Sequence, residues 1–301
     1  MRITQRAVAQ TALQGLNRNL GELGRTQERL TSGKQISRPS DSPTGVNRAM
    51  QVRQDKSAAL QQERNISDAK GWLEATDTAL TTMLAQVRRV RDLTVQASNE
   101  GAMSGTSRAA VATEVAALRD ALLGLANQTL DGRPLFGGVT EGSRAYDENG
   151  AYVGVGGTAG IPAIAVERRL SNTEVVRIDV AGPEAFGDPA DGDDLFALVG
   201  RIATDVTADP AALSGHLNAL DAGMERLLTA AASVGARAVR VDTASQVNAD
   251  LQLTLTKQLT AVEDIDLPKT IMQLNMQQTG YQAALSATAK VIQPTLVDFL
   301  R

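Results

Sequence analysis

Apolar residues at both ends of this 301-residue chain recur at alternating steps of three and four. That period places one apolar stripe along a helix and is typical of helices that pack as coiled coils. A single helix cannot bury its own stripe, so each end needs a partner, either the other end of the chain or a neighbouring copy. We therefore predict an assembly interface formed by Leu13, Leu16, Leu20, Leu23, Leu30, Ile271, Leu274, Tyr281, Leu285, Ile292, Leu296 and Phe299.

Two long internal segments show the same period. Ser42 and Pro43 suit the N-cap and first position of a helix that runs to about Ser98. Asp209 and Pro210 suit the start of a second long helix, and a shorter helix fits Thr106 to Thr129. Helices of such lengths predict a mainly α fold, an elongated antiparallel helical rod built from both chain ends. The buried stripe expected of the first long helix is Ile66, Ala69, Leu73, Thr76, Leu80, Met83, Val87, Val90, Thr94 and Ala97; that of the second runs from Leu213 to Val262 through Val234, Val241 and Ser245.

The middle of the chain has a different composition, with twelve of the 26 glycines between Gly132 and Gly192. The segment from Asp147 to Gly150 ends in Asn-Gly, which favours a tight hairpin turn flanked by Tyr146 and Tyr152. The alternating residues 175–180 predict a half-buried strand. We expect a small central β-rich insertion over residues 132–195, a helical rod domain over 43–131 with 196–265, and a terminal coiled-coil domain over 1–42 with 266–301.

Composition narrows the function. Aromatic residues make up only 3% of the chain, which favours helices packed side by side over a globular enzyme core. The net charge of −4 is too mild and mixed to indicate nucleic acid as a partner. The absence of cysteine excludes disulfides and cysteine-ligated zinc. The start of the chain lacks the pattern of a cleaved signal peptide, and residues 270–289 are too polar for a membrane span.

Two motifs could carry ligand chemistry. Gly154 to Ala159 fits a relaxed dinucleotide fingerprint, but no helical pattern follows to receive a pyrophosphate, so a β-turn is the better interpretation. Asp188, Asp191, Asp193 and Asp194 could bind calcium, although their spacing departs from that of an EF-hand. The alternative is that Asp193 or Asp194 caps a short helix through Leu195 to Val206.

Three further features have simple structural interpretations. His216, the only histidine, lies beside a predicted buried stripe and has no catalytic motif around it. Trp72 is most simply a packing anchor. The basic run from Arg88 to Arg91 is typical of a solvated face or of a strip of salt bridges between helices. We therefore predict no catalytic, metal or cofactor-binding residue.

Two segments of the chain resemble the bacterial flagellin family. The first is Arg29-Leu30-Thr31-Ser32-Gly33-Lys34 with Ile36, Ser40-Asp41, Pro43 and Gly45; the second runs from Gln86 to Asn99. The two prolines within residues 37–45, the Phe-Gly-Gly turn at residues 136–138 and the ending over 294–300 resemble the hook–filament junction branch of that family more than flagellin itself. Asp264-Ile265-Asp266 is similar to a segment that both branches share.

The resemblance implies a non-enzymatic structural component of the bacterial flagellum, outside the cell, that joins the hook to the flagellin filament and is needed for motility. The implied partners are copies of the chain, a hook-side junction protein, flagellin, an export chaperone and the type III export apparatus, with export requiring no cleaved signal peptide. Two alternatives stay open at this point. One is a flagellin filament subunit, and the other is a soluble coiled-coil scaffold unrelated to motility.

Overall fold

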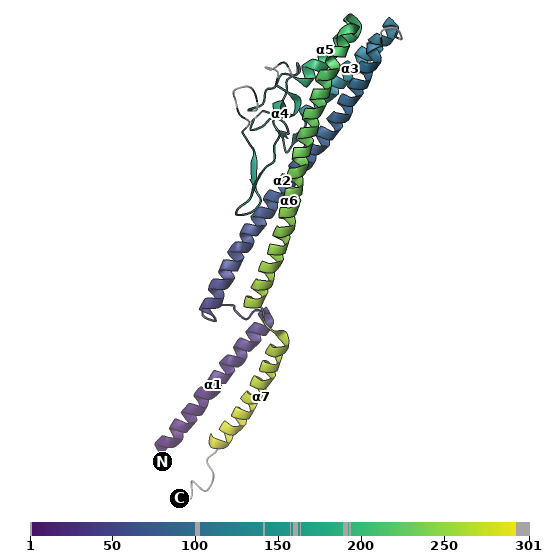
Figure 1. Cartoon of the computed structure of the whole chain (residues 1–301). Coiled ribbons are helices and arrows are strands. Elements are labelled where there is room, and N and C mark those ends of the chain that lie inside the picture. The colour runs from purple at the N-terminus through teal and green to yellow at the C-terminus, as the bar shows by residue number, and fades with distance from the viewer. Residues whose placement is uncertain are drawn as a thin grey trace. The chain divides into compact units, whose positions relative to one another are not determined.

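The computed structural model describes residues 2–99, 103–140, 142–156, 158, 162, 164–188, 192 and 194–292. The chain divides into two compact units: a terminal unit (Met1–Ala58 with Leu251–Arg301) and a central unit (Ala59–Asp250). The seven α-helices of the described residues are α1 (Arg2–Ser32), α2 (Pro43–Ser98), α3 (Gly105–Ala126), α4 (Gly182–Phe186), α5 (Leu195–Ala208), α6 (Leu213–Glu263) and α7 (Leu267–Ile292) (Figure 1).

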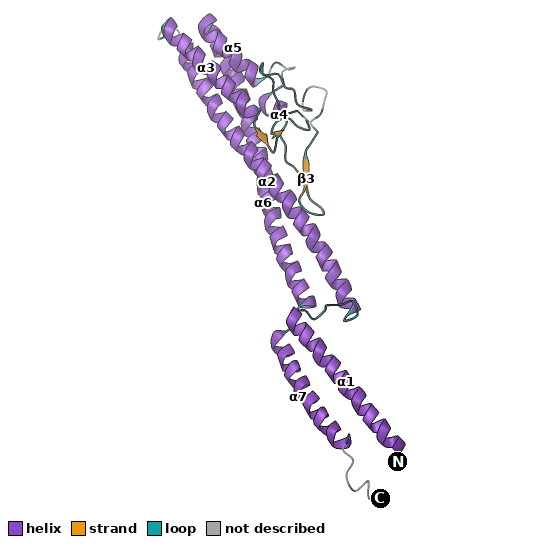
Figure 2. Ribbon diagram, turned by 180° about the vertical axis from the view of Figure 1, so that it is seen from behind, coloured by secondary structure: helices purple, strands orange, loops and turns teal. Residues whose placement is uncertain are grey.

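Strands are few and short. The antiparallel pair β1 (Thr129–Leu130) and β2 (Arg133–Pro134) follows α3, and β3 (Glu167–Arg169) pairs with β4 (Val175–Arg177) (Figure 2). The prediction of a mainly α fold from both chain ends with a small central β-rich part is confirmed. The predicted three-part domain division stays a prediction.

The prediction for α2 is confirmed, because the helix begins at Pro43 and ends at Ser98. All ten residues of its expected stripe, from Ile66 to Ala97, are buried in the central unit. On α6 the residues spaced by seven from Leu213 to Val241 are buried as expected. Ser245, however, is exposed and Ala244 packs against the core instead. Asn248 and Leu255, which also belong to the expected stripe, are buried again, so the departure at Ser245 is local.

Two boundaries differ from the predictions. The helix expected from Asp209 begins as one 3₁₀ turn, η2 (Pro210–Ala212), and becomes α-helical only at Leu213. The short helix α3 ends at Ala126, before the predicted Thr129, because residues 129–130 pair with β2. The apolar face expected of α3 nevertheless lies toward the core, with Val111, Val115 and Leu122 buried.

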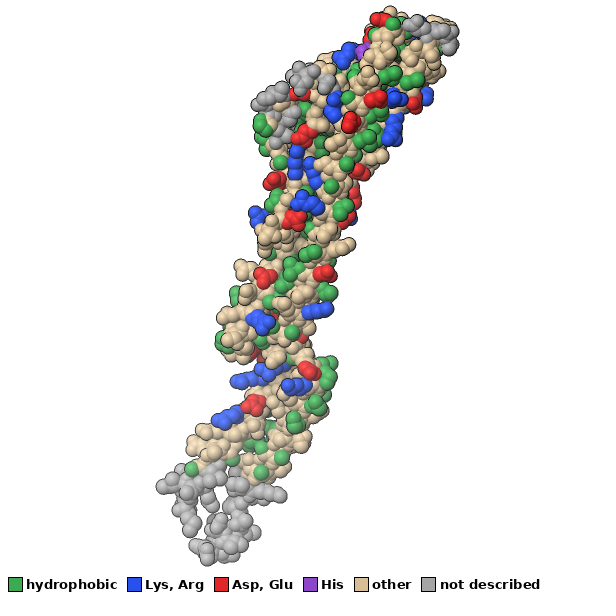
Figure 3. All heavy atoms as spheres, viewed as in Figure 1, with side chains coloured by type: hydrophobic (Ala, Val, Ile, Leu, Met, Phe, Trp, Pro, Cys, Tyr) green, Lys and Arg blue, Asp and Glu red, His purple; other side chains and the backbone are tan. Residues whose placement is uncertain are grey.

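Ion pairs fix the register between α2 and α6 in the central unit. Lys70 lies 2.8 Å from Asp242, and Arg91 lies 2.6 Å from Asp221. Sequence positions rise on α2 while they fall on α6, so the two helices run antiparallel. Figure 3 shows basic and acidic side chains close together over this surface. Of the two interpretations of the basic run, the salt-bridge strip holds for Arg91 and for Arg89, which pairs with Glu114 of α3 at 2.6 Å.

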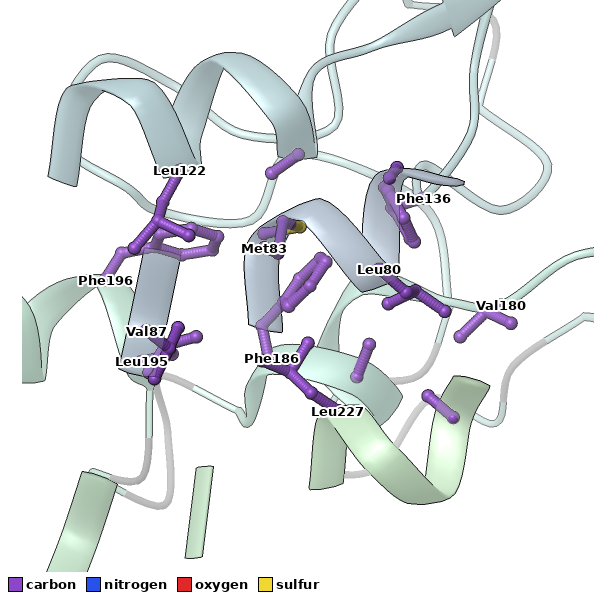
Figure 4. Packing of buried hydrophobic residues seen from close by; sticks show 14 of the residues in the cluster. Leu80, Met83, Val87, Leu122, Phe136, Val180, Phe186, Leu195, Phe196 and Leu227 are labelled. Atoms are coloured by element: carbon purple, nitrogen blue, oxygen red, sulfur yellow. The ribbon is translucent and has the colours of Figure 1, made fainter. Parts of the chain in front are cut away.

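The insertion packs on the helices through an aromatic cluster. Phe186 of α4 lies 4.9 Å from Phe136, 5.9 Å from Tyr146 and 5.4 Å from Phe196 between ring centroids. Figure 4 shows Phe186 and Phe196 beside Leu80, Met83 and Val87 of α2. The predicted hairpin is confirmed, because Tyr146 pairs with Tyr152 across the turn and Gly150 adopts a φ of 90°.

Charged side chains hold the β3–β4 hairpin on the long helices. Arg168 forms a 2.5 Å ion pair with Asp68 of α2, and Arg240 of α6 lies 3.0 Å from Glu174. Two residues after the end of β4, the buried Asp179 carboxylate accepts a hydrogen bond from the Arg177 guanidinium at 3.0 Å. The hydrogen bond to Asp179, followed by that to Glu184, raises the pKa of Arg177, so this guanidinium stays charged.

Asp194 confirms the capping interpretation of the acidic cluster. Its carboxylate accepts from the backbone N–H groups of Phe196 at 3.3 Å and Ala197 at 2.9 Å, which caps α5. Asp191 and Asp193 lie outside the described residues. Burial raises the pKa of Asp194, and the two backbone hydrogen bonds only partly offset that effect.

This raised pKa predicts how stability changes with pH. The unfolded chain ionises at Asp194 first, so stability falls as pH rises from about 3.8 through the higher folded pKa. Asp194→Asn keeps an oxygen acceptor without the charge, so its thermal stability relative to wild type should rise between pH 3 and pH 7. Asp194→Ala removes the same titrating group and also the cap, so it should be less stable than Asp194→Asn by about 1 kcal/mol at both pH values. Thermal melts of the three proteins at both pH values check this. A fall in the stability of Asp194→Asn relative to wild type between pH 3 and pH 7 would contradict the prediction.

Candidate assembly interface

The terminal unit contains α1 and α7 side by side and antiparallel (Figure 1, Figure 2). Both helices turn one stripe toward each other at alternating steps of three and four. These inward residues are buried or half-buried: Ala9, Ala12, Leu16, Asn19, Leu23, Thr26 and Leu30 on α1, and Thr270, Leu274, Gln277, Tyr281, Ala284 and Thr288 on α7. Many of them are small or polar, so the two helices bury little apolar surface against each other.

The residues of the predicted assembly interface divide into two groups. Leu16, Leu23, Leu30, Leu274 and Tyr281 belong to the inward stripes. The remaining described members stay in solvent: Leu13 is 52% exposed, Leu20 50%, Ile271 42% and Leu285 45%. Ile292 ends α7, its side chain lies outside the described residues, and so do Leu296 and Phe299.

The exposed group forms one face of the helix pair. Leu13 and Leu20 follow the inward residues Ala12 and Asn19 by one position. On α7, Ile271 and Leu285 follow Thr270 and Ala284 in the same way. Equivalent flanks of two antiparallel helices lie on the same side of the pair. We call Leu13, Leu20, Ile271 and Leu285 the flank face.

The opposite side of the pair is mainly polar, although Met276 is also exposed there. There, the residues that precede the inward positions are Glu22 and Arg29 on α1 and Gln273 on α7. With Arg25 they line a groove between the two helices. The four large aliphatic residues therefore gather on the flank face, whereas the groove side is mainly polar. In each seven-residue repeat, two positions face inward. A helix that carries apolar residues at a third position beside these two is typical of helices that pack against more than one neighbour.

The flagellin-like N-terminal motif builds the linker between α1 and α2. Gly33 ends α1 with a φ of 70° and donates to the carbonyl of Arg29 at 2.9 Å. Ile36 packs over Gly45, where a β-carbon would lie 2.5 Å from its Cδ1 atom. Asp41 accepts from the backbone N–H of Arg38 at 2.9 Å, and this bond, with that from Ser37, holds the pKa of Asp41 below its usual value.

Lys34 contacts Glu263 and Asp264, which lie near the other end of the sequence. Its Nζ atom lies 2.9 Å from Glu263 Oε2 and 3.1 Å from Asp264 Oδ1. The Glu263 carboxylate also lies 2.7 Å from Arg53 of α2. No periodic pattern in the sequence marks these side chains. The resemblance of both segments to one family was the available signal, because it marked them without showing that they touch.

The other candidate positions have structural surroundings. His216 Nε2 lies 2.8 Å from Asp205 Oδ2, a pair between α6 and α5 that the sequence did not reveal. Trp72 is buried, as predicted, with the Arg133 guanidinium 5.8 Å from its ring centre. The Gly154–Ala159 segment lies only partly within the described residues. Among those residues there is no group of three or more metal-ligating His, Cys, Asp or Glu side chains.

None of the helices that the structure describes combines the length and the hydropathy that a membrane crossing requires. Residues 3–141 match the family of the bacterial flagellin N-terminal helical region. The chain is similar to flagellar hook-associated protein 3 of Escherichia coli K12, with 26% identity over 95% of this chain and 96% of the relative. It is also similar to the flagellin of Bacillus subtilis 168, with 26% identity over 97% of each chain.

The fold is similar to that of the flagellar hook-associated protein-3 from Legionella pneumophila, with a TM-score of 0.60 and 14% sequence identity. That likeness covers 71% of this chain and 98% of the solved chain.

Proposed function

We propose that the chain is a member of the bacterial flagellin family and a structural subunit of the flagellum that joins the hook to the filament. The full-length similarity to hook-associated protein 3 of two bacteria supports the junction role. The flank face is the observation that carries the assembly role. Four large aliphatic side chains remain about half exposed on one side of the α1–α7 pair.

Assembly would cover this face with a neighbouring copy of the chain. The inward stripes are already occupied by the partner helix, so they hold the pair together within one subunit. The flank face then makes contacts between subunits, where burial of aliphatic carbon supplies roughly 25 cal/mol for each Å² removed from water. In this proposal Leu13, Leu20, Ile271 and Leu285 form the interface between copies. Ile292, Leu296 and Phe299 stay predicted members of it.

The remaining partners follow from the junction role. A ring of these subunits would contact a hook-side junction protein on one side and flagellin on the other. Export would use the flagellar type III apparatus without a cleaved signal peptide, and a chaperone would cover the C-terminal apolar segment before assembly. The subunit would work as a structural component of the flagellum, without catalysis.

Deletion of the gene in a motile host tests the junction role. We expect intact hooks without filaments, together with flagellin shed into the medium, and recovery of filaments on complementation. Electron microscopy of the cells and analysis of the culture medium provide the measurement. Filaments of normal number and length on the deletion strain would refute the proposal.

A filament subunit is the second candidate, because the similarity to Bacillus subtilis flagellin extends over 97% of each chain at the same identity. The two functions differ in self-assembly. A flagellin should grow into long filaments when the purified chain is nucleated, whereas a junction subunit should not. Electron microscopy of the nucleated protein separates the two. Discrete small oligomers with no effect on motility would instead indicate the coiled-coil scaffold.

A further inference from the structure

We propose that Glu263 is a positioning residue of the terminal unit. Its carboxylate holds the α1–α2 linker and the α6–α7 linker together, and so fixes the orientation of the α1–α7 pair relative to the adjoining ends of α2 and α6 in that unit. Ten residues separate α1 from α2, and three separate α6 from α7. Helical hydrogen bonding is interrupted at both places. Each linker would therefore allow the helix pair to turn unless another contact fixes it.

The backbone contact between the linkers is small. Gln35 N–H donates to the carbonyl of Glu263 at 2.6 Å, and Ile265 N–H donates to the carbonyl of Gly33 at 3.1 Å. These bonds form a single antiparallel bridge between Lys34 and Asp264. A two-stranded contact of this size is marginal in water without side-chain support. The stability of the bridge must therefore come from the side chains around it.

Glu263 supplies that support from the last position of α6. One carboxylate oxygen pairs with Lys34 on the first linker and the other with Arg53 on α2. The side chain of Glu263 is only 4% exposed, whereas those of Lys34 and Arg53 are 43% and 61% exposed. The carboxylate thus lies between two cations that come from different segments. Asp264 adds a second acceptor for Lys34.

The charge states of Glu263 and Lys34 favour an ion pair that persists at neutral pH. Burial acts to raise the pKa of Glu263, but the hydrogen bonds from Lys34 and Arg53 outweigh it and leave that pKa below its usual value. The hydrogen bond to Glu263 raises the pKa of Lys34. Both groups are therefore ionised at neutral pH. Loss of either charge leaves the other without its main partner, and the neutral amide of glutamine would leave two cations together.

This role rests on the proposed function only in that the α1–α7 pair is the assembling part. Hydrogen exchange of the full-length chain tests it directly, because the amides of Gln35 and Ile265 donate the two bonds of the bridge. In Glu263→Gln both amides should exchange faster together, by about tenfold or more, since a hydrogen bond to a charged group contributes roughly 1.5–3 kcal/mol. Peptides from residues 66–97 of α2 should exchange as in wild type.

Glu28→Gln is the matched control, because Glu28 pairs with Arg38 at 2.9 Å on the exposed surface and should leave both amides unchanged. Lys34→Gln removes the exposed partner and should reproduce the double effect if Glu263→Gln fails to fold. Faster exchange at only one linker, at neither, or throughout residues 66–97 would overturn the positioning role. Normal filaments on the deletion strain would refute the junction function without altering these exchange rates, so the two failures are distinguishable.

Discussion

Leu20→Asp should abolish swimming while the purified chain keeps its melting temperature. Leu20 is 50% exposed on the flank face, and a charge there stays hydrated in the free subunit. Surface substitutions of this kind usually change the free energy of unfolding by less than about 0.5 kcal/mol. In the assembled junction the same carboxylate would be buried against apolar carbon, which costs on the order of several kcal/mol. Thermal melts and a swimming assay of the complemented deletion strain measure the two effects.

Leu285→Asp should behave in the same way, because Leu285 lies on the same face at 45% exposure. Arg18→Asp, an exposed position of α1 away from the flank face, is the milder control. Leu23→Asp provides the opposite case, since its half-buried side chain belongs to the inward stripe and the change should loosen α1 from α7 within one subunit. Unfolding of the free Leu20→Asp protein, or normal swimming, would show that the flank face does not make the subunit contact.

The apolar period predicted which face of α2 is buried, because the stripe from Ile66 to Ala97 is buried along its whole length. At the chain ends the same period placed all the predicted interface residues in one stripe, whereas the structure divides the described ones between the inward stripes and the flank face. Leu13, Leu16, Leu20 and Leu23 alternate by three and four whether they face one partner or two. Only the position of α7 shows that Leu16 and Leu23 face inward while Leu13 and Leu20 do not.

The apolar periodicity of the helices could not predict contacts between residues that lie far apart in the sequence. Lys34 and Glu263 are 229 positions apart, and neither belongs to an apolar period. His216 and Asp205 are close in sequence, yet they lie on separate helices, α6 and α5, that are joined through the turn at η2. Periodicity reports which face of an element is buried, but it does not report which polar side chains the fold brings together.

The insertion depends on rings that the low aromatic content concealed. Five of the seven Phe and Tyr residues of the chain join one cluster: Phe136, Tyr146, Tyr152, Phe186 and Phe196. Phe186 contacts three of these rings and is fully buried. It comes from a helix of five residues, which has little stability of its own. The packing of α4 therefore rests largely on this side chain.

Phe186→Ala should destabilise the central unit strongly and leave assembly intact at low temperature. Removal of a buried phenylalanine ring costs about 3–5 kcal/mol, which lowers the melting temperature of a unit of this size by roughly 10 °C. The fluorescence of Trp72 reports this melt, because it is the only tryptophan and lies buried in the same unit. Phe186→Leu fills most of the space and should lose less. Swimming at a temperature well below the melt should persist, since the flank face belongs to the terminal unit. Loss of swimming there in a folded Phe186→Ala protein would mean that the insertion itself contacts a partner, and an unchanged Trp72 melt would mean that the cluster does not hold the insertion in place.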